Sequence, residues 1–250
     1  MAAPVRPCGE PAGRLRLAGR SILVVGGSTG IGRATVERLH AAGAQPHVAA
    51  LADQDLAALG ASGVVTYGGD VADASFVNSV AEAAACDALV YCAGLAMLAP
   101  FLDGRFEDWE RMFSVNLLAA MRFAQTVAPG MVARGGGQMV FVTSALAHAV
   151  YPNTTAYAAT KHGLSALCRG LRLELGSQRI RVSEVRPGLV GSTAIRVNSG
   201  SAHPAAAADL ATRPYAPIAP DDIARGIVFA LEAGDGVDVE LVEIKPTGQP

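Results

Sequence analysis

The sequence predicts an α/β protein in which helices cover both faces of a seven-stranded parallel sheet. From residue 21 onward, short apolar runs alternate with longer amphipathic segments. The short runs are apolar at consecutive positions rather than at every second position, which is typical of strands buried on both faces. Regular alternation of strands and helices gives right-handed crossovers, and therefore predicts a parallel sheet that is doubly wound by helices.

Strands and helices are predicted in strict alternation along most of the chain. The strands are expected at residues 21–25, 47–50, 64–67, 88–91, 138–143, 181–185 and 238–242. The helices are expected near residues 30–42, 53–59, 73–84, 106–131, 155–176 and 221–232. Residues 188–220 break the rhythm, because they have neither a helical nor a strand period. A long insertion after the carboxyl end of a strand predicts a substrate lid at about residues 189–219.

The composition favours one domain with a large core. Of the 250 residues, 51% are hydrophobic and only 17% are charged, against about 25% charged residues in an average soluble domain. No stretch of about 18 residues is uniformly apolar, so a membrane-spanning helix is not expected. We therefore expect a single domain over residues 19–250. Residues 1–18 are predicted to be a poorly ordered tail, with a docking arm as the alternative.

The charges and cysteines exclude several kinds of partner. The net charge of −2 gives no reason to expect a nucleic-acid partner. The four cysteines lack the spacing of metal ligands, so no metal site is expected. The first residues contain no apolar stretch typical of an export signal. We accordingly expect a cytoplasmic protein without membrane association.

A glycine-rich loop connects the first predicted strand to the first predicted helix. Glycines let the backbone approach a ligand closely, while the amides and dipole of the following helix favour an anion. Such a loop can also simply close a strand–helix connection, but its position favours a dinucleotide diphosphate and a Rossmann fold. No Lys-Ser or Lys-Thr pair follows, which disfavours a nucleoside triphosphatase. The loop consists of Gly26, Gly27, Ser28, Thr29, Gly30, Ile31 and Gly32.

The end of the second predicted strand is where a dinucleotide site usually selects between NAD and NADP. An acidic residue there holds the ribose 2′-hydroxyl, and an arginine accepts a 2′-phosphate. The strand ends at Ala50 with neither, and Asp53 lies three residues further on. The lack of cationic groups slightly favours NAD over NADP. Asp70 is placed to accept a hydrogen bond from the adenine amino group, or alternatively to cap the helix that begins near Ala74.

A tyrosine and a lysine four residues apart form the strongest chemical signal. Tyr157 and Lys161 share one helix face, and Lys161 is one of only two lysines in the chain. A free tyrosine has a pKa of about 10, and a neighbouring ammonium group lowers that pKa. The pair is therefore a candidate acid/base. The alternative is a tyrosine packed against the aliphatic stem of an ordinary surface lysine.

Further motifs complete a recognisable order along the chain. After the glycine-rich loop come Ala93-Gly94, Asn116, Ser144, Tyr157-x-x-x-Lys161 and Pro187-Gly188. In this order they resemble the short-chain dehydrogenase/reductase (SDR) family, and the likeness covers roughly residues 18–246. The resemblance implies an NAD(P)-dependent oxidoreductase that interconverts a secondary alcohol and a ketone by hydride transfer, acting on CH–OH donors.

The resemblance also implies individual roles. Tyr157 would exchange a proton with the substrate oxygen, and Ser144 would hydrogen-bond that oxygen. Lys161 would bind the nicotinamide ribose and lower the pKa of Tyr157, and Asn116 would bend its helix and hold a water for proton relay. His148 and Tyr151 are expected near the substrate. The implied cofactor contacts are Gly26, Ser28, Thr29, Gly30, Ile31, Gly32, Ala50, Asp70, Val71, Ala93, Gly94, Tyr157, Lys161, Pro187, Gly188, Val190 and Ser192.

Two features distinguish the chain within this resemblance. Tyr91-Cys92 replaces the usual Asn-Asn before Ala93, so supporting side-chain amides are missing. The ending at residues 242–249 is similar to a subgroup with NADP-dependent 3-hydroxy acid dehydrogenases and clavulanic-acid-type reductases, which suggests a small polar or secondary-metabolite alcohol. A catalytically idle dinucleotide-binding regulatory protein on the same fold is the alternative function. Apolar residues on several faces of the two longest helices predict a homo-oligomer. The predicted oligomer is a homotetramer, and a dimer is the alternative.

Overall fold

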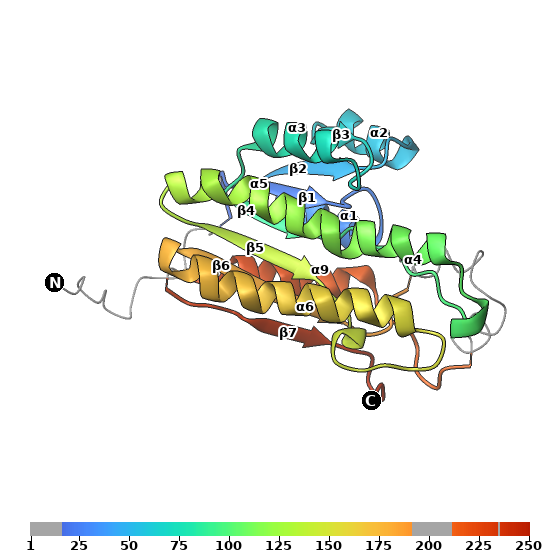
Figure 1. The fold of residues 1–250 in the computed structure, drawn as a ribbon. Helices are drawn as coiled ribbons and strands as arrows, with labels where there is room; N and C mark the ends of the chain where they lie inside the picture. Colours follow the sequence, from blue (N-terminus) through green and yellow to red (C-terminus); the bar gives the residue numbers. More distant parts are fainter. Residues whose placement is uncertain (1–16, 192–211, 235) are drawn as a thin grey trace.

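One parallel sheet organises the part of the chain that the structure describes. The structure, a computed structural model, describes residues 17–191, 212–234 and 236–250. The strands are β1 (Ser21–Val25), β2 (Gln45–Ala50), β3 (Val65–Gly68), β4 (Ala88–Tyr91), β5 (Gly137–Val142), β6 (Ile180–Pro187) and β7 (Leu241–Ile244). They form a seven-stranded sheet in the order β3-β2-β1-β4-β5-β6-β7, with every neighbouring pair parallel (Figure 1). The predicted seven-stranded parallel sheet is confirmed.

Helices cover both faces of this sheet (Figure 1). They are α1 (Gly30–Ala41), α2 (Gln54–Ala61), α3 (Ala74–Ala84), α4 (Phe106–Phe113), α5 (Ala119–Ala133), α6 (Thr155–Leu175) and α9 (Pro220–Leu231), with a π-helical turn at Ser114–Leu118. Apolar side chains of α3, α5 and α6 pack on one face of the sheet, and those of α1, α2 and α9 pack on the other. The predicted doubly wound arrangement is confirmed.

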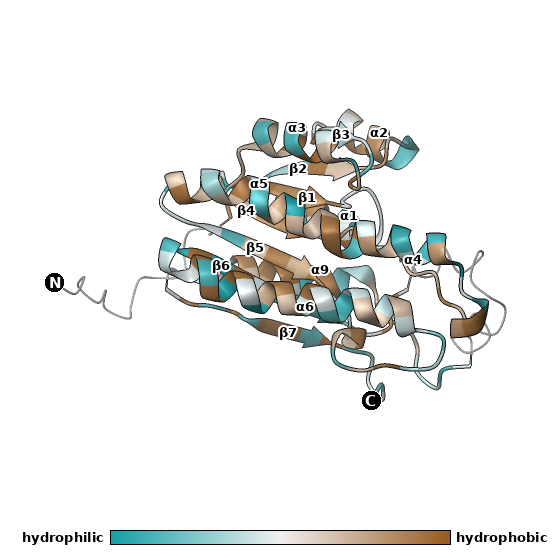
Figure 2. Ribbon diagram, viewed as in Figure 1, coloured by the Kyte–Doolittle hydropathy of each residue, from teal (hydrophilic) through white to brown (hydrophobic). Residues whose placement is uncertain are grey.

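The strands are buried from both sides, as their continuous apolar runs predict. In β1, Leu23 and Val25 belong to the core beneath α3, α5 and α6, while Ile22 and Val24 belong to the core beneath α1, α2 and α9. All four side chains have 0% exposure. Figure 2 shows β1 as largely hydrophobic, whereas the helices carry hydrophilic residues as well. The apolar excess of the composition is therefore divided between two cores.

The order of the strands reverses at the neighbours β1 and β4. The chain proceeds from β1 outward through β2 to β3, and then returns to the centre with β4 beside β1. The loops after these two strands consequently leave the sheet in opposite directions. In open parallel sheets this switch point is where ligands bind, at the carboxyl ends of the strands.

Several predicted boundaries differ from the structure by one to three residues. The last strand begins at Leu241 rather than at residue 238, because pairing with β6 starts where Leu241 lies opposite Glu184. The helix predicted at residues 106–131 is interrupted by the π-helical turn. Leu17, assigned to the tail, is fully buried in the core with α1 and β1, so the packed domain begins at least two residues before residue 19. The predicted lid lies mostly outside the described residues.

No helix in the described ranges combines the length and apolar character needed to cross a membrane.

Candidate active site

A cavity of about 490 Å³ lies at the carboxyl ends of the central strands. One wall is the glycine-rich loop between β1 and α1, and the opposite wall carries Ser144, Tyr157 and Lys161. The cavity therefore joins the predicted cofactor loop to the predicted catalytic group, although the two are more than a hundred residues apart in the chain.

The glycines of the loop are required by close backbone contacts. Gly26 has φ of +79°, and a Cβ atom there would lie 2.6 Å from the Ala93 amide nitrogen of the neighbouring β4 loop. A Cβ atom at Gly32 would overlap the Gly26 carbonyl oxygen. The loop is thus folded tightly on itself at the switch point, where only glycine fits.

The start of α1 offers hydrogen-bond donors to an anion. Thr29, the N-cap residue, is extended and makes no side-chain hydrogen bond to the helix. The first-turn amides of a helix have no intrahelical partner, and here Gly30, Ile31 and Gly32 line the cavity. This arrangement fits the diphosphate of a dinucleotide, since the helix dipole favours negative charge and the glycines allow close approach.

The end of the cavity beside β2 and β3 carries acidic side chains. Ala50, Asp53, Asp70 and Val71 line it, as does Arg111 of α4. The Asp53 carboxylate accepts a hydrogen bond from the Leu56 amide at 2.9 Å and caps α2.

Asp70 does not cap the helix that follows it, because Asp73 caps α3. That alternative for Asp70 was wrong. Its carboxylate instead accepts a hydrogen bond from the Ala72 amide at 2.9 Å and pairs with Arg111 at 2.8 Å. The sequence offered no signal for Arg111, because the two paired residues lie on separate elements.

The predicted catalytic residues converge on the carboxyl end of β5. Ser144 directly follows this strand region and is 8% exposed, while Tyr157 and Lys161 on α6 are 6% and 4% exposed. The Tyr157 hydroxyl is hydrogen-bonded to Ser144. The Lys161 ammonium donates to the Val142 carbonyl at 3.1 Å and lies 5.8 Å from the Tyr157 ring centroid.

Burial shifts the pKa values of Tyr157 and Lys161. It raises the pKa of Tyr157 to about 12, an effect that the hydrogen bond with Ser144 only partly offsets. Burial also lowers the pKa of Lys161 to about 8. We expected Lys161 to lower the pKa of Tyr157. The pKa is instead raised, because removal of the phenol from water is the largest effect, and the effect that lowers the pKa comes from Ser144.

Asn116 is fully buried in the π-helical turn. Its amide accepts from the Leu95 amide at 2.7 Å and donates to the Leu95 carbonyl at 2.8 Å and to Thr160 at 3.0 Å. The side chain therefore connects the loop after β4 to the residue before Lys161. π-helical turns are frequent at functional sites.

Tyr91 supports the same turn from β4. Its buried hydroxyl donates a hydrogen bond to the Val115 carbonyl at 2.6 Å. In the sequence alone, Tyr91 is distinguished only by the side-chain amide that it lacks. Its role as a donor to the π-helical turn could not be read from residues that are 24 positions apart.

The remaining predicted residues divide into three groups. Ser28, Ala93, Gly94, Pro187, Gly188 and Val190 line the cavity as expected. Ser192 lies outside the described residues. His148 and Tyr151 are not among the residues that line the described cavity.

Both predicted substrate residues from the loop after β5 have partners elsewhere. His148 faces Glu243 of β7 at 3.8 Å, and the guanidinium carbon of Arg213 lies 5.4 Å from the Tyr151 ring centroid. Thr143, which was not among the predicted site residues, does line the cavity. In the ranges that the structure describes, no group of three His, Cys, Asp or Glu side chains could hold a metal ion.

Comparison with known sequences identifies related proteins. The family model described as short chain dehydrogenase matches residues 20–203. L-xylulose reductase of Mesocricetus auratus is 40% identical over 197 residues, which cover 76% of this chain and 80% of that protein. Carbonyl reductase [NADPH] 2 of Sus scrofa is 34% identical over 181 residues, covering 71% of this chain and 74% of that protein.

A solved structure agrees with the fold. The 7α-hydroxysteroid dehydrogenase complexed with NADH and 7-oxo glycochenodeoxycholic acid matches with a TM-score of 0.80 and 25% identity. The match covers 92% of this chain and 94% of that chain. The relative named for NADPH and the structure with NADH together leave both nicotinamide cofactors open for this chain.

Proposed function

Because this chain belongs to the short-chain dehydrogenase family and is an NAD(P)-dependent oxidoreductase of alcohols and ketones, we propose that Tyr157 is its acid/base. One observation carries the proposal. Ser144, Tyr157 and Lys161 line the same cavity as the glycine-rich loop. A substrate oxygen beside Tyr157 would therefore lie in the same cavity as a cofactor whose diphosphate is held by that loop.

The protonation of the site favours reduction of a carbonyl compound. With its pKa raised to about 12, Tyr157 carries its proton at neutral pH. Tyr157 donates this proton to the carbonyl oxygen, while Ser144 holds the same oxygen by a hydrogen bond. When bound, the reduced nicotinamide supplies hydride to the carbonyl carbon. The product is the alcohol, and Tyr157 recovers a proton from solvent.

The residues that line the cavity indicate which of them would hold the cofactor. The amides at the start of α1 would hold the diphosphate, and Lys161 would donate to the nicotinamide ribose. A small polar ketone, including one from secondary metabolism, is the substrate class we propose. The similarity to L-xylulose reductase supports a polar substrate, as does the similarity of the chain's ending to 3-hydroxy acid dehydrogenases.

The first test is the variant Tyr157→Phe. We expect it to abolish turnover of every active ketone in a panel, because the ring remains while the proton donor is removed. NADH and NADPH binding, measured by fluorescence titration, should change less than about threefold since the diphosphate contacts are intact. Unchanged turnover in this variant would reject Tyr157 as the acid/base, whereas a wild type that turns over no ketone in the panel would favour the catalytically idle binding protein.

We further propose that the enzyme prefers NAD over NADP. Asp53 and Asp55 line the cavity near Ala50 and Leu51, where a 2′-phosphate would meet negative charge and no arginine at the end of β2. Leu51 is 58% exposed, so Leu51→Arg can be accommodated. We expect this variant to strengthen NADPH binding at least about tenfold relative to NADH. Leu51→Gln is the neutral control, and an equal shift in both variants would argue against the electrostatic explanation.

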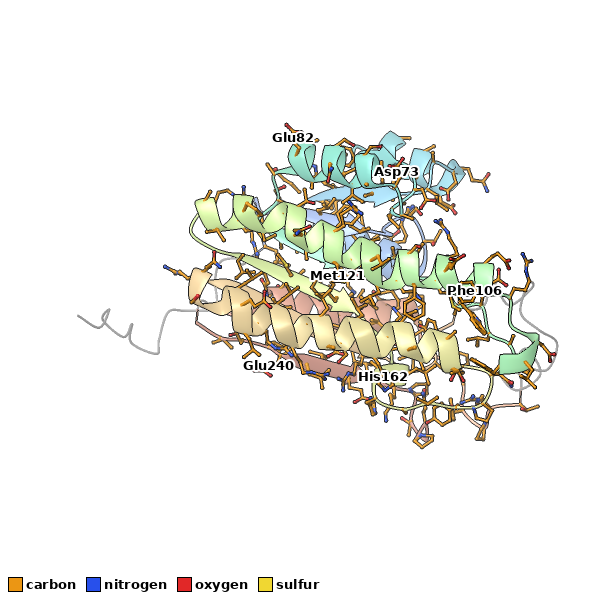
Figure 3. The ribbon with its side chains drawn as sticks, viewed as in Figure 1. Asp73, Glu82, Phe106, Met121, His162 and Glu240 are labelled. Atoms are coloured by element: carbon orange, nitrogen blue, oxygen red, sulfur yellow. The ribbon has the colours of Figure 1, made fainter. Side chains whose placement is uncertain are left out.

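We propose that the chain forms a homotetramer with α5 and α6 in one of its interfaces. A groove of about 970 Å³ lies between these helices and is lined by apolar side chains that include Leu118, Met121 and Leu171. Met121 can be followed beside this groove in Figure 3. Arg122 and Glu174 stand at the same groove. Under two-fold symmetry, opposite charges of this kind can pair between copies.

A further inference from the structure

A buried carboxylate lies behind the active site, on the face of β6 that packs against α6. Glu184 is 2% exposed, although it carries a charged group in the middle of the sheet. Burying an unpaired carboxylate is strongly unfavourable, so its surroundings must compensate for the lost water. It is not a lining residue of the cavity, and none of the roles described above uses it.

Each oxygen of this carboxylate has two hydrogen-bond donors. Oε1 accepts from the Thr143 hydroxyl at 2.8 Å and from Arg186 Nε at 2.7 Å. Oε2 accepts from the Ser165 hydroxyl at 3.0 Å and from Arg186 Nη2 at 3.2 Å. Arg186 also donates to Ser165 at 3.1 Å. The group is therefore closed, with both carboxylate oxygens and both hydroxyls used.

The donors come from three segments that build the active site. Thr143 lies between Val142, whose carbonyl accepts from Lys161, and Ser144. Ser165 is one helical turn after Lys161 on α6, on the same face. Arg186 directly precedes Pro187 and Gly188 of the cavity wall. One carboxylate thus connects the end of β5, the catalytic helix and the end of β6.

We propose that Glu184 is a positioning residue for the reaction, which holds Ser144 and Lys161 at their working separation. The hydrogen bond to Thr143 fixes the end of β5, and the one to Ser165 fixes α6 beside it. Without them, the hydrogen bond from Lys161 to the Val142 carbonyl is left to set the separation of the two elements, together with apolar contacts that do not define distance or angle sharply. Misplacement of catalytic groups by about 1 Å can cost on the order of a hundredfold in rate. The proposal rests on the function proposed above.

Three variants separate positioning from stability. Glu184→Gln weakens the network and leaves Arg186 without its counter-ion. The double variant Glu184→Met and Arg186→Met replaces the pair by apolar side chains, which is often neutral or stabilising. Gln138→Met removes a polar side chain with 1% exposure at the opposite end of β5, which donates to the Ala230 carbonyl at 2.6 Å. This last variant is the control for loss of a buried polar network.

We expect the double variant to recover the urea resistance that Glu184→Gln loses, but not its activity. Both variants should show kcat lowered at least about tenfold, with NADH affinity changed less than about threefold. Gln138→Met should lose stability while kcat stays within about twofold of the wild type. Recovery of both stability and kcat in the double variant would overturn the proposal, since the pair would then be merely structural.

Amide hydrogen exchange of the cofactor-free protein gives a readout that does not require activity. Faster exchange of the segment around residues 140–147 is expected in Glu184→Gln and in the double variant, but not in Gln138→Met. Unchanged exchange in that segment would also overturn the positioning role. If the wild type reduces no carbonyl compound, the exchange result still stands, so failure of the proposed function is distinguishable from failure of this inference.

Discussion

Lys161 carries a buried charge that the fold must tolerate. Its pKa is about 8 in the folded protein, against an ordinary value of 10.5 for the exposed side chain. Between these values the unfolded chain binds more protons than the folded one, so the free energy of unfolding rises with pH across this range. Below about pH 8 the folded state bears the full cost of the charge. The buried Lys161 therefore destabilises the folded protein below about pH 8.

The variant Lys161→Met should remove this dependence. Its free energy of unfolding relative to the wild type should be most favourable below about pH 8, and that advantage should shrink toward pH 10 by up to about 1.4 kcal/mol per pH unit. Urea denaturation at several pH values measures the difference. A difference that stays constant with pH would contradict the lowered pKa of Lys161.

At the level of elements, the turn from β1 to α1 is the most constrained connection in the site. The contacts that a Cβ atom at Gly32 would make involve backbone atoms of Gly26 and Gly27, which cannot rotate away. The loop would have to open, and the amides at the start of α1 would then lose their placement for a diphosphate.

Gly32→Ala should therefore destabilise the protein by about 1–3 kcal/mol and weaken NADH binding at least about tenfold. Thermal unfolding and fluorescence titration provide the two measurements. Gly176→Ala is a matched control, because no atom lies within 4 Å of the added methyl group and its φ of −58° suits alanine. Equal behaviour of the two variants would show that the loop has room for a side chain.

On the scale of the whole molecule, two of the exposed large apolar side chains lie at the groove between α5 and α6. Leu118 and Met121 are 55% and 44% exposed, and the groove between the helices lies beside them. Apolar groups concentrated at one groove are typical of an interface. The active site lies at the carboxyl ends of the strands, so an interface here leaves the cavity open.

We expect Met121→Glu to reduce the oligomer to smaller species, because it places a charge among apolar side chains at the centre of the contact. Light scattering at micromolar concentration should show a mass below that of the wild type. Leu173→Glu is the control, since Leu173 on α6 is 86% exposed and does not line the groove. A wild type that is monomeric at this concentration would refute the tetramer.

The sequence by itself determined the features that depend on local chemistry. A strand that is apolar at consecutive positions is stable only when both of its faces are covered. The apolar pattern therefore predicted a parallel sheet with helices on both faces. The glycines at 26–32 permit a tight turn before a helix, and Tyr157 and Lys161 must share a helix face at a spacing of four. These properties are carried by neighbouring residues.

Only the tertiary structure decided what depends on burial and on partners distant in the chain. It reversed the expected direction of the Tyr157 pKa, because desolvation is set by the packing around the phenol. It paired Asp70 with Arg111 and turned His148 toward Glu243. It also brought Thr143, Ser165 and Arg186, which come from three separate segments, around the Glu184 carboxylate. A sequence specifies which groups exist and their local spacing, while their solvation and long-range partners arise only when the chain is packed.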